Sequence, residues 1–417
     1  MDLRTGQPVW LQDDPEDLTF SRIKHAVKCD VAVVGAGITG ALVTHQLLEA
    51  GLTVAVIDKR RVGRGSTAAS TGLLLYQTDT SLADLEKRHD RATARRVFYL
   101  GRRAIRELGQ LTRDLSQPCG YKKRPSLYVA SRPSAVATLK SEQRHLRKID
   151  LRGAMLSREK LVRAYGFAKP AALETAGAAE INAFQLTRAV FRHHRRSKHL
   201  RVFEKTTAAK VTETPDSVVL RLANGHIIRA RRVVIAAGYE AMRFVQSDLV
   251  KLHSTYVIAS PPLSPEVLWP HRALMWETAR PYFYLRTTAD NRVVFGGRDE
   301  PFSDEKRRDK LLRRKTRELE KQFAALFPHL AFTAEFAWTG TFAETTDGLP
   351  CIGPAKPHSR VLYGLGYGGN GITFSQIAAR ILRDVCLGKK NRDLDLFRFD
   401  RLSKSKFYPT NHTKHTK

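Results

Sequence analysis

A glycine-rich turn between an apolar strand and a helix constrains this chain more than any other feature. Residues 29–34 form a short apolar, β-branched run, which the motif GAGITG (35–40) follows at once. A helical pattern then extends through Ala50, and a second apolar run, 53–57, ends at Asp58. This succession of strand, glycine turn, helix, strand and terminal acid predicts a dinucleotide-binding fold.

Each part of this motif has a physical role. The first glycine permits a tight turn, the second lets the backbone approach a pyrophosphate, and the third allows helix and strand to pack closely. Phosphates would bind at the helix N-terminus, where free N–H groups and the helix dipole favour negative charge. Asp58 would accept hydrogen bonds from ribose hydroxyls. The alternative is a purely structural glycine turn.

Three later segments have compositions suited to a bound ligand. Residues 62–76 are small, hydroxyl-rich and punctuated by glycine, which is typical of a chain passing closely over a flat ligand, although a simple flexible loop is the alternative. After a hairpin turn at Asn224-Gly225, residues 232–238 form a buried strand that ends in small residues. Near the C-terminus, a second glycine loop (366–373) precedes a helix and could stabilise negative charge on a reduced ring.

The motifs GAGITG, GSTAASTG, VVIAAG, TTDGLPCIGP and GYGGNGIT occur in the order seen in the D-amino-acid oxidase superfamily. The chain resembles its glycine oxidase, sarcosine oxidase and γ-glutamylputrescine oxidase-like branch over about residues 28–395. The resemblance implies an α/β fold: a discontinuous Rossmann-type FAD-binding domain (28–118, 180–245, 336–395) and a second α+β substrate domain built on an antiparallel sheet (119–179, 246–335). We expect the basic tail, 403–417, to be disordered.

The resemblance also implies which residues contact FAD, with the backbone near Thr207 and Ala208 touching the adenine. The expected contacts are Gly35, Gly37, Ile38, Thr39, Gly40, Asp58, Lys59, Ser66, Thr67, Ser70, Thr71, Ala208, Ala237, Gly238, Gly366, Gly368, Gly369, Asn370, Gly371, Ile372 and Thr373. Sarcosine oxidases that bind flavin covalently carry a cysteine where this chain has its 340–342 region, and Cys351 lies beyond it. FAD is therefore expected to bind without a covalent bond.

The sequence contains no triad-like grouping, metal-ligand spacing or P-loop, so no metal is expected and the cofactor must carry the chemistry. The expected reaction is hydride transfer from a C–H beside nitrogen, in a small amine or amino acid, to the flavin. The resulting imine would hydrolyse to a carbonyl, and oxygen or a quinone or other carrier would reoxidise the flavin. Two alternatives are a tRNA-modifying flavin oxidase acting on a glycine-like adduct and a non-catalytic flavoprotein subunit.

The expected substrate cap is the segment 276–297. Strand alternation would place Tyr282, Tyr284 and Arg286 on one face, where a guanidinium beside phenols could clamp a carboxylate. The alternative is an ordinary cross-strand surface pair, in which case attention moves to Arg298. Tyr367, in the C-terminal glycine loop, is the third candidate catalytic residue beside Tyr284 and Arg286.

Charge and hydropathy bear on the partners of the protein and on its location in the cell. Seventy-one Lys and Arg against 41 Asp and Glu give a net charge of +30, which raises the question of a nucleic-acid partner. The basic residues are spread through helical stretches, a pattern that favours a solvated surface. The same reading applies to His193, His194 and His199. The N-terminal 20 residues do not resemble a signal peptide and no long apolar stretch occurs, so we expect a cytoplasmic protein.

Overall fold

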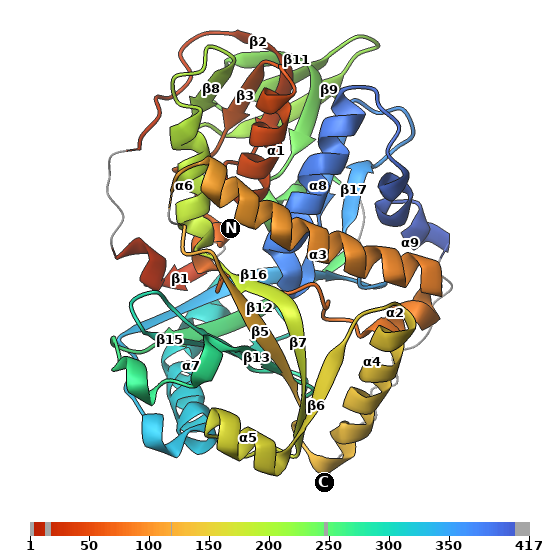
Figure 1. Cartoon of the computed structure of the whole chain (residues 1–417). Helices are drawn as coiled ribbons and strands as arrows, with labels where there is room; N and C mark the ends of the chain where they lie inside the picture. Colours follow the sequence, from red (N-terminus) through yellow and green to blue (C-terminus); the bar gives the residue numbers. More distant parts are fainter. Residues whose placement is uncertain (1–3, 13–17, 118, 246–248, 405–417) are drawn as a thin grey trace.

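The computed structural model describes residues 4–12, 18–117, 119–245 and 249–404. Figure 1 shows two β-sheets with the long helix α3 (Arg91–Asp114) crossing between them. The first sheet has the strand order β17-β18-β11-β2-β3-β8, and β10 joins β9 to β11. Its strands are β2 (Val27–Val34), β3 (Val54–Ile57), β8 (Leu200–Phe203), β9 (Ala208–Glu213), β10 (Val218–Leu222), β11 (Ile227–Ile235), β17 (Cys351–Pro354) and β18 (Val361–Leu365).

The first sheet is parallel at its centre, where its strands carry continuous buried apolar runs. β3 is fully buried, and so are the last four residues of β2. Continuous apolar runs of this kind need cover on both faces, which favours parallel pairing with helical crossovers. Three helices lie beside these strands in the upper half of Figure 1: α1 (Ile38–Glu49), α6 (Ala183–His193) and α8 (Gly371–Cys386). Both predicted motif strands and the helix between them are present, and Gly225 lies in the hairpin turn with a φ of +86°.

The second sheet has the order β1-β16-β12-β15-β14-β13-β5-β7-β4, and β6 pairs with β7. Its neighbours are antiparallel except for the parallel pair β13–β5. The strands are β1 (Arg4–Gly6), β4 (Leu73–Leu74), β5 (Lys122–Val129), β6 (Gly153–Ser157), β7 (Ala171–Glu180), β12 (Val250–Ala259), β13 (Leu274–Glu277), β14 (Tyr284–Thr287), β15 (Val293–Glu300) and β16 (Phe336–Thr345).

Helices cover the second sheet as well. A core of Phe295, Phe323 and Phe327 joins β15 to the helix that follows it. Figure 1 shows α4 and α5 near β6 at the lower edge of the molecule. The remaining helices are α2 (Leu82–Arg88), α4 (Val136–Lys148), α5 (Arg158–Tyr165), α7 (Glu305–Leu326) and α9 (Arg401–Lys404).

The chain is therefore an α/β protein with a Rossmann-type sheet and a second, largely antiparallel sheet. The division into domains at the expected boundaries stays a prediction, and the strand pairing differs from it in two respects. β4, inside the expected FAD-binding segment 28–118, pairs with β7 in the second sheet. β16 pairs along its full length with β12 in the second sheet, so the chain returns to the first sheet only at β17. The first two residues of the expected tail, 403 and 404, belong to α9, and 405–417 lie outside the described residues.

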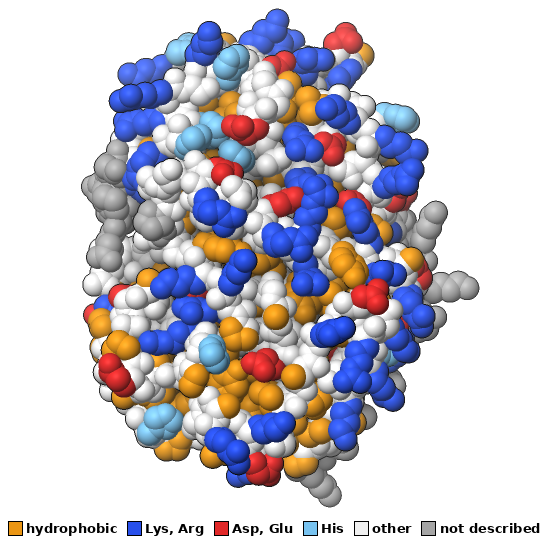
Figure 2. Space-filling view, in the orientation of Figure 1, with side chains coloured by type: hydrophobic (Ala, Val, Ile, Leu, Met, Phe, Trp, Pro, Cys, Tyr) orange, Lys and Arg blue, Asp and Glu red, His pale blue; other side chains and the backbone are white. Residues whose placement is uncertain are grey.

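Basic side chains occur over the whole face seen in Figure 2, with acidic and apolar side chains among them. This distribution is compatible with the solvated surface expected from the sequence. Within the described part of the chain, no helix combines the length and the apolar character needed to cross a membrane.

Candidate functional site

The glycine turn between β2 and α1 packs against the end of β11. Gly35 has a φ of +111°, and a Cβ there would lie 2.4 Å from the backbone oxygen of Ala236. A Cβ on Gly40 would lie 1.8 Å from the backbone oxygen of Gly35. Backbone atoms cannot move aside as side chains can, so both positions require glycine. The N-cap of α1 is Gly37, which has no side chain to occupy the first N–H groups of the helix.

Asp58, at the end of β3, joins the glycine turn to its own strand. Its Oδ2 accepts the N–H of Ala36 and its Oδ1 accepts the N–H of Arg60, both at 2.7 Å. Burial raises the pKa of Asp58 above its usual range, and the two hydrogen bonds oppose that shift. A carboxylate has about four lone-pair sites, so Asp58 retains acceptor capacity for a ligand.

One cavity follows the carboxyl ends of the central strands of the first sheet and reaches the second sheet. In open α/β sheets this edge is where ligands bind. Most residues expected to contact FAD line this cavity: Gly35, Gly37, Ile38, Thr39, Asp58, Lys59, Ser66, Thr67, Ser70, Thr71, Ala208, Ala237, Gly238, Gly366, Gly368, Gly369, Asn370, Gly371 and Ile372.

Two of the expected contacts do not line the cavity. Gly40 is enclosed by the glycine turn, as described above. The hydroxyl of Thr373 points instead to the segment after β4, where it donates to the backbone oxygen of Leu75 at 3.2 Å. Both residues therefore support segments that line the cavity and do not line it themselves.

The hydroxyl-rich segment places polar groups along the cavity. The short helix η2 (Ser66–Ala69) carries Thr67, whose Oγ1 accepts the N–H of Ile38 at 2.9 Å. The Oγ of Ser66 is buried and has no hydrogen-bond partner in the protein. A buried hydroxyl of this kind is costly unless a ligand supplies the missing hydrogen bond. Lys59 also lines the cavity, where its ammonium pairs with the carboxylate of Glu240.

The C-terminal glycine loop lines the cavity beside the first motif, where the hydroxyls of Thr39 and Ser375 are 2.7 Å apart. Gly366 and Gly368 have φ values of +77° and +57°. The side chain of Asn370 donates to the backbone oxygens of Leu75 and Gln77, at 3.1 and 3.0 Å. These bonds hold the loop, and hence the N-terminus of α8, beside the cavity. Figure 1 shows α8 next to α1 on this side of the sheet.

At the end of the cavity formed by the second sheet, acidic and phenolic groups gather. The hydroxyl of Tyr282 donates to Oδ1 of Asp79 at 2.8 Å, and the N–H of Gly369 donates to its Oδ2 at 2.6 Å. The Tyr284 hydroxyl and the Oγ1 of Thr255 are 2.9 Å apart and share a hydrogen bond. Burial raises the pKa values of both tyrosines, so both are neutral phenols at neutral pH.

Asp299 completes this acidic end. Burial of the carboxyl raises its pKa to about 7; the Thr255 hydroxyl opposes the shift, and the negative charge of Asp79 adds to it. Its Oδ1 is buried without a hydrogen-bond partner in the protein. A carboxyl with a pKa near 7 in a cavity can hold or accept a proton at physiological pH.

Arg286 does not reach the cavity, which corrects the expected carboxylate clamp. The side chain is 2% exposed, and its Nη1 donates to the backbone oxygens of Gly72 and Ile181, both at 3.0 Å. The guanidinium also lies over the ring of Trp10, 5.0 Å from the ring centre. Strand alternation placed Arg286 on the same face as Tyr284, but the segment around Gly72 lies between the guanidinium and the cavity.

Other candidates from the sequence have defined places. Tyr367 lines the cavity, and its hydroxyl is buried close to Gly364. His253 lies outside the lining, and its ring stacks on Phe342. Asp347 accepts the N–H of Leu349 at 3.1 Å and so caps the turn after β16. His194 is buried, and the solvated face expected for the three histidines is therefore wrong for this residue.

Sequence reasoning did not find Asp79 or Asp299. Asp79 comes from the loop before α2 and meets Tyr282 only through the tertiary fold. For Asp299, the sequence does hold one indication, the pair Gly296-Gly297 shortly before it. Gly296 lies opposite Tyr284 in the sheet, and a Cβ on Gly296 would lie 2.3 Å from the tyrosine ring. A glycine required by the close approach of an aromatic ring therefore indicates tight packing three residues before Asp299.

Cysteine and histidine, the residue types that most often tether flavins, are absent from the described lining of the cavity. Cys351 is buried in β17, Cys119 is buried as well, and all four cysteines are free. The lining thus agrees with a cofactor held by hydrogen bonds and packing.

Comparison with known proteins identifies similar chains. Residues 30–385 match the family model described as DAO, FAD dependent oxidoreductase. The chain is 27% identical to gamma-glutamylputrescine oxidoreductase of Escherichia coli, covering 94% of this chain and 89% of that protein. It is 25% identical to a glycine oxidase of Bacillus licheniformis, covering 89% and 97% of the two chains. The crystal structure of glycine oxidase from Geobacillus kaustophilus superimposes with a TM-score of 0.76 at 20% identity, covering 90% and 99%.

Proposed function

Because the chain belongs to the DAO family of FAD dependent oxidoreductases, we propose that it oxidises the C–N bond of a small amine or amino acid, giving an imine that hydrolyses to a carbonyl compound. Within this range we propose that the preferred substrate carries an ammonium group and no carboxylate beside it. The observation that carries the proposal is the pairing, in one cavity, of a dinucleotide-binding end with an acidic and phenolic end.

The residues of the first sheet fit FAD, which is held without a covalent bond. The N-terminus of α1, where the N-cap residue Gly37 has no side chain, and the unpartnered hydroxyl of Ser66 offer hydrogen bonds to phosphate oxygens, and Asp58 offers acceptors to ribose. The N-terminus of α8 is also without a side-chain cap, so it can stabilise negative charge at the other end of the cofactor. When bound, FAD supplies the two-electron oxidation.

The acidic end of the cavity would bind and orient the amine. Asp79 is held by Tyr282 and by the backbone of Gly369, so its position is set before substrate arrives. Asp299 and Asp79 favour a cation in the cavity and disfavour a carboxylate, because like charges repel at short range. The names of the two relatives give gamma-glutamylputrescine as the substrate of the Escherichia coli enzyme and glycine as that of the Bacillus licheniformis enzyme.

Asp299 would also move a proton. An ammonium group must lose a proton before its C–N bond can be oxidised to an imine, since the nitrogen lone pair becomes part of the new double bond. The unpartnered Oδ1 of Asp299 is available to accept that proton, and a pKa of about 7 matches this task at physiological pH. The phenol of Tyr284, hydrogen-bonded to Thr255, would position the substrate beside it.

The test is anaerobic mixing of the purified protein with amines, each paired with the amino acid that differs from it only by an α-carboxylate. We expect the amines to bleach the flavin absorbance and their amino-acid partners to react more slowly. Reduction by the amino acids alone would overturn the amine preference, and failure of every compound would overturn the oxidase assignment. Reoxidation of the reduced protein with air or with a quinone then identifies the electron acceptor, which we propose to be one of these two.

A further inference from the structure

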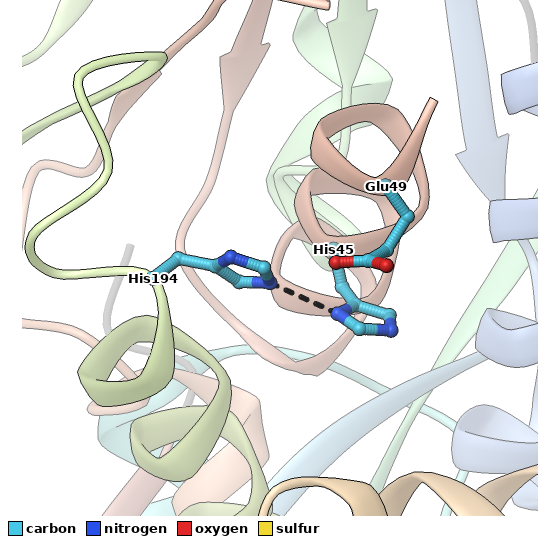
Figure 3. Close-up of side chains that lie close together, drawn as sticks. All are labelled: His45, Glu49 and His194. Carbon is cyan, nitrogen blue, oxygen red and sulfur yellow. Dashed lines mark hydrogen bonds between the residues drawn. The ribbon is translucent and has the colours of Figure 1, made fainter. Parts of the chain in front are cut away.

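Outside the flavin cavity, three potential metal ligands meet between α1 and the end of α6. They are His45 and Glu49 of α1, and His194, which caps the C-terminus of α6. One ligand atom from each lies within 4.8 Å of the other two. Figure 3 shows the three side chains converging on one small space, with the carboxylate of Glu49 beside the imidazole of His45.

The sequence pattern explains half of this arrangement. His45 and Glu49 are four residues apart on α1, and residues at this spacing are neighbours on one face of a helix. His194 comes from a distant part of the sequence and reaches the same face because α6 packs beside α1 (Figure 1). The three residues therefore form no local sequence motif, which is why the sequence did not indicate the site.

The two imidazoles face each other through ring nitrogens. The Nδ1 of His45 and the Nε2 of His194 are 3.0 Å apart. Two neutral rings in this arrangement need one shared proton, or a cation, between their lone pairs. Nitrogens that bind one tetrahedral zinc ion at about 2.0–2.1 Å lie about 3.4 Å from each other, so a small outward shift of the rings would admit the metal.

A helix C-terminus and a carboxylate favour a cation here despite the net charge of +30. His194 is 8% exposed and lies at a helix C-terminus, where the helix dipole stabilises positive charge. The carboxylates of Glu49 and Asp114 both place negative charge near His45.

We propose that His45, Glu49 and His194 form a binding site for a zinc ion, with water in the fourth position. Two imidazoles and one carboxylate are a ligand set that zinc accepts, and a bound ion would tie α1 to α6. Since α1 begins at the glycine turn, the ion would stabilise the helix on which the nucleotide end of the cavity is built. This proposal does not depend on the substrate or on the oxidase activity.

The experiment uses the full flavin-loaded chain, stripped with a chelator and titrated with zinc chloride by calorimetry. We expect one zinc ion per chain. Glu49→Gln should weaken binding at least about tenfold, and the double variant His45→Gln/His194→Gln should abolish it. His199→Gln, which removes an exposed histidine near the site but outside the cluster, should bind as the wild type does.

Thermal unfolding provides the second readout, because a ligand that binds only the folded state raises the melting temperature. Zinc should raise the melting temperature of the wild type and of His199→Gln by the same amount, and that of Glu49→Gln by less at the same zinc concentration. Flavin content and circular dichroism establish that each variant is folded; Glu49 is exposed, so its variant decides the matter if the double variant does not fold. Wild-type protein without stoichiometric zinc binding, or Glu49→Gln with unchanged affinity, would overturn the proposal.

Discussion

At the residue scale, the ionisation of Asp299 links the site to stability. Its pKa is about 7 in the folded protein and near 3.8 when unfolded, so the folded state binds the proton more tightly. Stability therefore falls as pH rises from about 4 to 7, and the cost above pH 7 is at most about 4 kcal/mol. Asp299→Asn, which is neutral at all pH values, should be more stable than the wild type at pH 8, and the gap should shrink toward pH 4.

Urea unfolding of both proteins across this pH range measures the difference in their free energies of unfolding. A parallel series with Asp216→Asn, an exposed aspartate on the hairpin side of the first sheet, controls for surface charge. A gap between wild type and Asp299→Asn that does not change with pH would contradict the raised pKa.

The third glycine of the motif tests the geometry of the turn. Gly40→Ala would place a Cβ 1.8 Å from the backbone oxygen of Gly35, so α1 must move away from the turn. We expect a loss of about 1–3 kcal/mol in stability and a protein that purifies largely without FAD. Gly225→Ala is the matched control: its φ of +86° strains the hairpin turn, but its Cβ would meet no neighbour. Full flavin occupancy in the Gly40 variant would show that the close packing is dispensable.

The contrast between predicted and missed residues is physical. Gly35, Gly40 and Asp58 act through a local strand, turn and helix, and a local motif carries that information in the sequence. Asp79 and Asp299 acquire their roles from burial and from contact with segments far away in the chain. Neither burial nor distance can be read from one sequence.

At the element scale, Arg286 joins three segments. Its guanidinium bridges the backbone before β4 to the end of β7 and packs on Trp10 from the N-terminal segment. Arg286→Lys keeps the charge but loses the planar guanidinium that packs on the Trp10 ring and whose Nη1 donates to both carbonyl oxygens. We expect a loss of about 1–3 kcal/mol in stability and weaker flavin retention.

The same variant separates this structural role from substrate binding. Arg286→Lys should leave the ratio of flavin reduction rates for an amine and its amino-acid partner unchanged, and Arg221→Lys on the exposed side of β10 should change nothing. A selective loss of reactivity toward the carboxylate-bearing partner would restore the clamp. Alternation along β14 was predictable from the sequence, but the covering segment at Gly72 was not, because side-chain period does not reveal what packs above a strand.

At the scale of the whole molecule, the motif order predicted the α/β architecture, the second antiparallel sheet and the cofactor. The pairing of β16 with the second sheet was not predictable, because strand order depends on long-range contacts that a linear motif order does not contain. The resemblance to known flavoproteins was sufficient to predict the architecture. The three-dimensional structure was needed to find the acidic end of the cavity.

The mode of FAD binding is a property of the whole chain. We expect the purified protein to be yellow and to release all of its flavin into the supernatant when acid or heat precipitates it, because the described lining offers no cysteine or histidine for a covalent bond. The absorbance of supernatant and washed pellet measures this directly. Yellow colour retained by the pellet would identify a covalent attachment.

The central claim, that one cavity oxidises an amine through FAD, is tested most directly by a single turnover without an electron acceptor. The flavin-loaded protein is mixed anaerobically with the amine that reduces it fastest in the paired panel, and the carbonyl product is trapped and counted. The account predicts one carbonyl for each flavin reduced. Flavin reduction without a carbonyl product, or a carbonyl product without flavin reduction, would contradict it.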